Sequence, residues 1–231
     1  MKLCSILCLA WNMLPYTQEC VESLFRYTCY PFELIIVDNG STDHVTGEYL
    51  KNLEPDTPYL RRYKVTINPE NLGTTKGGNQ LLREAAGDYL AIISNDMIFV
   101  ENWLEDIIGY MEENPDISSV SPAWLSGDLD TFSERAEHYK QLHGIAQPGY
   151  MGGMFVMTRE CFNKVGYFDE QFEKAGWEDR DYELRLLLNG CKPVILHKVV
   201  LYHYGMVTRK HFDGKYEAEN ACKFAKKYGL L

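Results

Sequence analysis

The chain of 231 residues is long enough to bury one substantial hydrophobic core and short enough that a single domain is the default. Its formal net charge of −10, without any Lys/Arg run to reverse the field locally, excludes nucleic acid and anionic membranes as bulk partners. The seven cysteines are widely spread and form no C-x-x-C pair, which indicates reduced, mostly buried thiols in a cytoplasmic protein.

The first residues resemble a secretion signal only superficially. The stretch Leu3 to Leu14 is apolar, but Ser5 and Asn12 interrupt it and no small-residue cleavage site follows. No apolar run approaches the roughly 20 residues that a membrane-spanning helix needs. We therefore expect a buried first strand here and no transmembrane segment.

Short apolar runs that end in turn residues alternate along the chain with longer helical patterns. This alternation is typical of a mixed, mostly parallel sheet flanked by helices, so we predict an α/β fold in one domain. In the first hundred residues we expect strands at 3–10, 33–37, 61–67 and 89–93. The expected helices are 17–26, a second that Thr42 or Asp43 caps and that ends near 53, and a third that follows the loop 68–73 and ends at 86.

The second half continues with a helix at 103–111 and a strand at 117–122. Residues 124–149 show no clear hydrophobic periodicity and contain several Gly, Ser and charged residues. This composition favours a mobile or substrate-facing segment. Further on we expect a strand at 154–157, helices at 160–165, 178–189 and 216–228, and one or two strands within 193–203.

Asp38 follows the strand 33–37 at the edge where open α/β sheets place their ligands. A carboxylate there can accept hydrogen bonds from a nucleoside base or from ribose hydroxyls. The alternative is a tight turn, because Asp38-Asn39-Gly40 favours positive φ angles. Taken alone, the turn is the better interpretation.

Ser94-Asn95-Asp96 ends a buried strand with hard oxygen ligands, which suit Mg²⁺ or Mn²⁺ between two phosphates. Asp96 is the strongest metal ligand candidate, and capping of the helix at 103 is the alternative. His203, at the end of a late strand, is a second candidate ligand. A histidine in such a position is more often part of the core.

Glu178, Asp179 and Asp181 place three carboxylates in the first turn of a predicted helix. They can simply complement the helix dipole, at about 0.3–1 kcal/mol for each exposed acid, and Asp181 has the spacing of an ion pair with Arg185. Alternatively, one carboxylate is a general base toward an acceptor hydroxyl. Trp177 would then offer a flat face to a sugar ring, although a core position explains it equally well.

In this order the motifs resemble the family 2 glycosyltransferases, inverting enzymes of the GT-A (Rossmann-like) fold, over nearly the whole chain. Residues 1–100 would then form the nucleotide-sugar donor half, 101–205 the acceptor half and 206–231 a C-terminal tail. The matching segments are 34–43, 68–73, 77–79, 87–96, 152–153, 165–170, 177–179 and the region of His203.

The resemblance implies a role for each site residue. Asp38 would bind the nucleoside, and Asp96 would hold the metal with His203 near the diphosphate. Asp179 would be the catalytic base, beside Glu178 in the same motif. The remaining donor-site residues would be Asn68, Asn71, Asn79, Asn95, Trp177 and Lys76, the last of which is a departure from many relatives and is otherwise an exposed helix residue.

The resemblance also implies the reaction and the partners. A sugar would pass from a nucleotide-diphosphate donor, a UDP-sugar above all, to a hydroxyl of a glycan, lipid-linked or protein-linked acceptor, as in polysaccharide biosynthesis, with Mn²⁺ or Mg²⁺ as cofactor. Transient contact with a membrane that carries the acceptor stays open. The alternatives are a non-catalytic sugar-binding module on the same fold and a sugar-1-phosphate nucleotidyltransferase, whose basic, Gly-rich first loop has no counterpart after residues 9–12.

Overall fold

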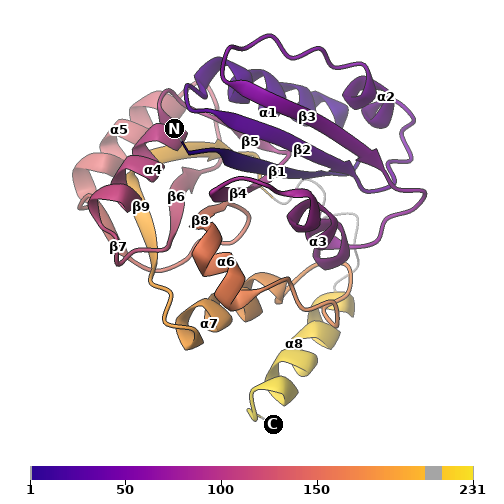
Figure 1. Ribbon diagram of the computed structural model, residues 1–231, viewed down its shortest axis with the longest axis vertical. Coiled ribbons are helices and arrows are strands. Elements are labelled where there is room, and N and C mark those ends of the chain that lie inside the picture. Colours follow the sequence, from indigo (N-terminus) through magenta and orange to yellow (C-terminus); the bar gives the residue numbers. More distant parts are fainter. Residues whose placement is uncertain (1, 206–214, 231) are drawn as a thin grey trace.

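The computed structural model of the chain describes residues 2–205 and 215–230 and is shown in Figure 1. A mixed sheet with the strand order β3-β2-β1-β4-β8-β6-β9-β5 runs through the molecule, and β7 pairs with β9 beside this path. The strands are β1 (Cys4–Ala10), β2 (Phe32–Asp38), β3 (Leu60–Ile67), β4 (Tyr89–Ser94), β5 (Met97–Ile98), β6 (Ser119–Leu125), β7 (Ala146–Pro148), β8 (Phe155–Thr158) and β9 (Pro193–His203). The helices are α1 (Leu14–Tyr27), α2 (Thr46–Lys51), α3 (Thr74–Glu84), α4 (Trp103–Glu113), α5 (Phe132–Leu142), α6 (Arg159–Val165), α7 (Glu178–Leu188) and α8 (Lys215–Lys227).

Helices cover both faces of the sheet, and the alternation of side chains along β1 explains how. Ile6 and Cys8 point into one core layer, which they share with α1 and α4, whereas Leu7 points into the other with α3, α6 and α7. Successive side chains of a strand leave opposite faces, so one strand serves two layers. The predicted α/β fold is therefore confirmed.

The direction of the strands determines which strand ends lie together at an edge of the sheet. β3, β2, β1 and β4 are parallel to one another. β8 runs antiparallel to both of its neighbours, β4 and β6, and β9 is parallel to β6. The carboxyl ends of β1, β2, β4, β6 and β9 consequently meet at one edge of the sheet, and β8 begins there.

The largest difference from the expected elements lies between residues 124 and 149. That segment was expected to be irregular, but it contains the helix α5 and the strand β7. The expectation was wrong because α5 buries only Phe132 and Ala136, which leaves too few apolar residues for a clear helical period.

Smaller differences concern helix ends. α1 begins three residues before position 17, with Pro15 in its first turn. α2 is shorter than expected and has Val45 as its N-cap, although Asp43 accepts hydrogen bonds from the N–H groups of Val45 and Thr46. The single strand β9 spans the region for which one or two strands were expected. The residues 206–214 of the expected tail lie outside the described residues.

Two expectations about the whole chain can be compared with the structure. Within the described residues, no helix is both long and apolar enough to cross a bilayer. Five of the seven cysteines are buried and all are reduced, as the sequence predicts; Cys29 and Cys222 are exposed.

Candidate active site

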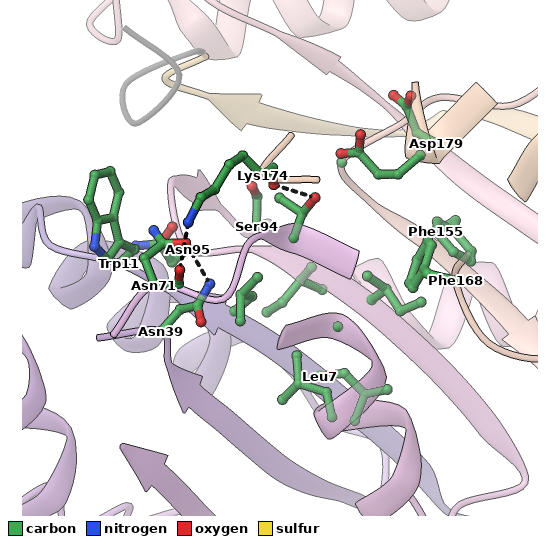
Figure 2. A pocket seen from close by; sticks show the side chains of 18 of the residues that line it. Leu7, Trp11, Asn39, Asn71, Ser94, Asn95, Phe155, Phe168, Lys174 and Asp179 are labelled. Atoms are coloured by element: carbon green, nitrogen blue, oxygen red, sulfur yellow. Dashed lines mark hydrogen bonds between the residues drawn. The ribbon is translucent and has the colours of Figure 1, made fainter. Parts of the chain in front are cut away.

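A cavity of about 190 Å³ lies at the carboxyl edge of the sheet, between the first half of the chain and α7 (Figure 2). Its walls come from β1, the ends of β2 and β4, α3, the start of β8 and the first turn of α7. The lining residues are Leu7, Leu9, Trp11, Asn39, Asn71, Thr74, Gly78, Leu81, Ile92, Ile93, Ser94, Asn95, Tyr150, Gly153, Phe155, Phe168, Lys174, Glu178 and Asp179.

Glu178 and Asp179, the two predicted catalytic residues, reach this cavity from the N-terminus of α7, and their catalytic role stays a prediction. The backbone at Gly152 passes so close that a Cβ atom there would overlap the Asp179 carboxylate. The glycine thus permits this close approach, and the half-buried Asp179 lies between α7 and the segment before β8.

Tyr150 shares the cavity with the two acids. Burial, together with the negative charges of Asp179 and Glu178, raises the pKa of the Tyr150 hydroxyl well above its usual value. The phenol therefore keeps its proton at neutral pH and is a hydrogen-bond donor in the cavity. Sequence reasoning missed Tyr150.

The opposite wall is built on a network of asparagines, labelled in Figure 2. Nδ2 of Asn39 donates to Oδ1 of Asn71 at 3.3 Å and to the carbonyl of Gly73 at 3.2 Å. Oδ1 of Asn39 accepts from the N–H of Leu72 at 3.1 Å. Asn39 therefore holds the loop between β3 and α3 in place, and it lines the cavity itself.

Lys174 brings a positive charge to this wall. Its Nζ donates to the carbonyl of Asn71 at 2.8 Å, while its own carbonyl accepts from the N–H of Thr74 at 2.6 Å. Gly73 has a φ of +85° and lies against the Lys174 backbone, so this contact also leaves no room for a side chain. An ammonium group here can bind a phosphate oxygen.

Three of the predicted donor residues lie behind the cavity wall. Asp38 is buried, and its Oδ1 accepts from the N–H and the hydroxyl of Ser41. The amide of Asn68 pairs with Gln80 and Asn39. Asn79 bonds to the backbone of Phe168 and to Glu170. In the structure these side chains support the wall, and their contact with a donor stays a prediction.

Of the other four predicted donor residues, Asn71 lines the cavity within the asparagine network, and the remaining three are dispersed. Asn95 lines the cavity and donates from Nδ2 to the Thr17 hydroxyl at 2.8 Å. Lys76 is exposed on α3, in a neighbouring groove. Trp177 packs against Phe224 of α8, with ring centroids 5.1 Å apart, and is not among the lining residues.

Asp96 and His203, the two predicted metal ligands, lie next to each other beside the cavity, and their role as ligands stays a prediction. The pairing of β5 with β9 brings them together, and Nε2 of His203 lies 3.1 Å from Oδ1 of Asp96. This is the distance of a hydrogen bond between the two side chains, and it is also close to the separation of about 3 Å between neighbouring ligands of an octahedral cation, each at about 2.1 Å. Nδ1 of His203 is buried and has no hydrogen-bond partner among the described residues.

Asp96 and His203 supply two protein ligands, and an octahedral cation takes six. Among residues 2–205 and 215–230, no group of three or more His, Cys, Asp or Glu side chains could hold a metal ion. Oxygens of a bound diphosphate and of water are further ligands that such a cation accepts.

Sequence reasoning missed Asn39, Lys174, Tyr150 and Trp11 as lining residues. Trp11 directly follows β1, so the rule that ligands bind at strand ends could have identified it. Asn39 belongs to a segment that the resemblance includes. For Lys174 and Tyr150 the sequence offers no local signal, because their positions depend on the long-range contact of α7 with the first half of the chain.

Comparison with known proteins decides the family. Residues 5–172 match the family described as glycosyl transferase family 2. The chain belongs to this family. Residues 136–212 also match a family described as the N-terminal domain of galactosyltransferase.

Relatives of this family 2 member come from several organisms. An uncharacterized glycosyltransferase of Haemophilus influenzae is 31% identical over 118 residues, which are 51% of this chain and 35% of the relative. The chondroitin synthase of Pasteurella multocida is 24% identical over 237 residues, with 83% of this chain and 23% of the relative covered. The glucosyl-dolichyl phosphate glucuronosyltransferase of Haloferax volcanii is 25% identical, with 76% of this chain and 58% of the relative covered.

Solved structures confirm the GT-A fold of the family 2 chain. GalNAc-T7 with UDP, GalNAc and Mn²⁺ superimposes with a TM-score of 0.69 and 16% identity over 88% of this chain and 44% of that structure. A mannosyltransferase of Pyrobaculum calidifontis with GDP-Man and Mn²⁺ gives a TM-score of 0.67 and 18% identity over 87% and 56%. The chain thus spans about half of these structures, and 35% and 23% of the first two relatives.

Proposed function

We propose that the chain is the catalytic unit of an inverting, metal-assisted glycosyltransferase that uses a nucleotide-sugar donor, a UDP-sugar above all. The observation that carries the proposal is a single cavity. It is lined on one side by the acids of α7 and on the other by polar side chains that follow strands of the first half of the chain. The sheet edge offers amides and Lys174 for a nucleoside diphosphate, and α7 offers a base. Family membership and the nucleotide and Mn²⁺ of two structural neighbours support the proposal.

The chemistry follows from this arrangement. Asp179 accepts the proton of an acceptor hydroxyl, whose oxygen forms a bond to the anomeric carbon of the sugar. The bond from that carbon to the phosphate oxygen breaks on the opposite side, so the configuration inverts and the nucleoside diphosphate leaves. Lys174 and a bound cation at Asp96 and His203 would stabilise the negative charge on the leaving group.

A thermal-shift panel of UDP- and GDP-sugars, with and without Mn²⁺ or Mg²⁺, tests the donor site. A ligand that binds only the folded chain stabilises it by about 2.7 kcal/mol at a hundred times its Kd. We expect a UDP-sugar to raise the melting temperature only when a divalent cation is present. The variant His203→Ala should lose most of the metal-dependent rise in melting temperature. The control His138→Ala, on the exposed side of α5, should keep this rise.

Two outcomes would contradict the proposal. If no nucleotide-sugar stabilises the chain with either metal, the donor site is wrong. If a donor binds but a panel of glycan, lipid-linked and protein-linked acceptors yields no transfer, the chain is a binding module. When transfer occurs, NMR of the product reports whether the anomeric configuration has inverted.

A further inference from the structure

The C-terminal helix α8 contacts the chain at the segment that leads into α7. In Figure 1 it stands apart from the sheet and lies near α7. Lys223 donates to the carbonyl of Gln171, and Lys227 pairs with Asp169 and Asp181. These contacts, together with the packing of Phe224 on Trp177, dock α8 on residues 169–177 before the two acids and on Asp181 after them.

Asn220 is the centre of this contact. Asn220 is fully buried, with 0% of its surface exposed. Oδ1 accepts from the N–H of Glu173 at 3.2 Å, and Nδ2 donates to the carbonyls of Glu173 at 2.9 Å and of Gly176 at 3.0 Å. One side-chain amide therefore satisfies backbone groups at both ends of residues 173–176.

The segment needs such support because its backbone is strained. Lys174 has a φ of 58° and Trp177 a φ of 71°, both in the left-handed region that side chains disfavour. Gly176 between them has a φ of 100°. Conformations of this kind persist only where surrounding contacts hold them, and they concentrate at functional sites.

Both walls of the cavity depend on this segment. Lys174 reaches the loop before α3 through its Nζ and the α3 N-terminus through its carbonyl. Trp177 is the N-cap of α7, so the backbone continues directly into Glu178 and Asp179. A shift of the segment would displace the ammonium group and the base together.

We propose that Asn220 is a positioning residue, which acts through the backbone of 173–177 to hold Lys174 and Asp179 at the site. The inference rests on the proposed transferase function and adds to it a role for α8. Asn220 touches neither the cavity nor a reacting group, so its effect passes entirely through the segment that it holds.

The test compares Asn220→Ala with Asn189→Ala, a matched control at the exposed C-terminal end of α7, where the amide also donates to a carbonyl. A misplacement of about 1 Å can reduce a rate by about a hundredfold. We expect kcat of Asn220→Ala to fall by roughly ten- to a hundredfold, with a smaller rise in the donor KM. Hydrogen exchange of residues 173–177 should accelerate in the same variant, and the control should match the wild type in both measurements.

The results separate the positioning role from the transferase function. An active wild type with an equally active, folded Asn220→Ala would overturn the positioning role alone, as would a loss of kcat without faster exchange. A wild type without transfer would refute the proposed function. If Asn220→Ala does not fold, Asn220→Ser, which keeps one donor and one acceptor, takes its place. If Asn220→Ser is also unfolded, Asn220 supports the whole fold and the inference fails.

Discussion

The two acids at the start of α7 differ in what surrounds them. Asp179 lies against the backbone of Gly152, which leaves no space for a side chain there. Glu178, one residue earlier, is longer and reaches the same cavity. We therefore expect the shorter and more closely held side chain, Asp179, to be the base, because proton transfer needs a fixed distance between donor and acceptor.

Asp179→Asn should lower kcat by about 10² to 10⁴, the usual contribution of a general base, because an amide cannot accept the proton. The Kd for the nucleoside diphosphate should change little, since the donor binds at the other wall. Initial rates and calorimetric titration measure the two quantities separately. In the comparison variant Glu178→Gln we expect a smaller loss; an equal or larger one would move the base assignment to Glu178.

At the level of residues, sequence and structure agree where a motif follows a strand or begins a helix. Asn95, Glu178 and Asp179 were predicted and line the cavity. Asp38 and Asn79 were predicted at the donor, yet both are occupied by backbone hydrogen bonds. A sequence shows which side chains are polar, but their hydrogen-bond partners depend on the packing of segments that are distant along the chain.

Among the larger elements, the segment before β8 controls the approach to α7. Gly152→Ala would place a methyl group on the Asp179 carboxylate. We expect kcat to fall at least about tenfold, because the carboxylate must move away from the acceptor. Gly144→Ala is the control, since a Cβ atom there meets nothing within 4 Å. Rates of both variants, with melting temperatures to exclude unfolding, test this; full activity of Gly152→Ala would contradict the geometry.

The docking of α8 on the loop before α7 should depend on pH. Burial alone would raise the pKa of Asp169, but hydrogen bonds from Lys227 and Gln171 outweigh it and lower the pKa below its usual value. The stabilisation is therefore present above about pH 4, the unfolded value, and is lost as the pH falls through the folded pKa.

We expect Asp169→Asn to be less stable than the wild type at neutral pH, by a few degrees in melting temperature, and the difference to shrink in acid. Melting curves from neutral to acidic pH measure it. Asp116→Asn, at a side chain that is 83% exposed, should follow the wild-type profile. A difference between Asp169→Asn and the wild type that stays constant with pH would exclude the Asp169 contact as its cause.

The elements of the fold were predictable wherever a core face is rich in apolar residues. The buried strands β1, β2 and β4 were expected within one residue at each end. α5 was not, because it buries only two of its residues and most of its surface faces water. The order of the strands depends on which edges pair, and short runs such as Met97–Ile98 carry no sequence signal for that pairing.

In the whole molecule, one part of the core, around Trp103, lies apart from the cavity. Trp103 is fully buried on α4, stacks near Phe99 and donates from Nε1 to the Thr28 hydroxyl at 2.9 Å. None of these groups lines the cavity.

Trp103→Phe should therefore lower the free energy of unfolding by about 1–3 kcal/mol, because it removes ring volume and leaves a buried hydroxyl without its donor. At 25 °C kcat should remain within about twofold of the wild type, because a folded variant keeps the same site. Urea denaturation and initial rates measure the two effects. A parallel loss of activity in the folded variant would show that the two layers of the core are coupled to the site.

The order of the elements along the sequence has a consequence for a chain that is still being synthesised. The parallel strands with the asparagine network leave the ribosome early, whereas β8, α7 and α8 follow much later in the sequence. A chain interrupted before residue 178 would keep one wall of the cavity and lack both carboxylates. Translation thus delivers the proposed base well after the asparagine network, so an unfinished chain of this length lacks both acids of α7.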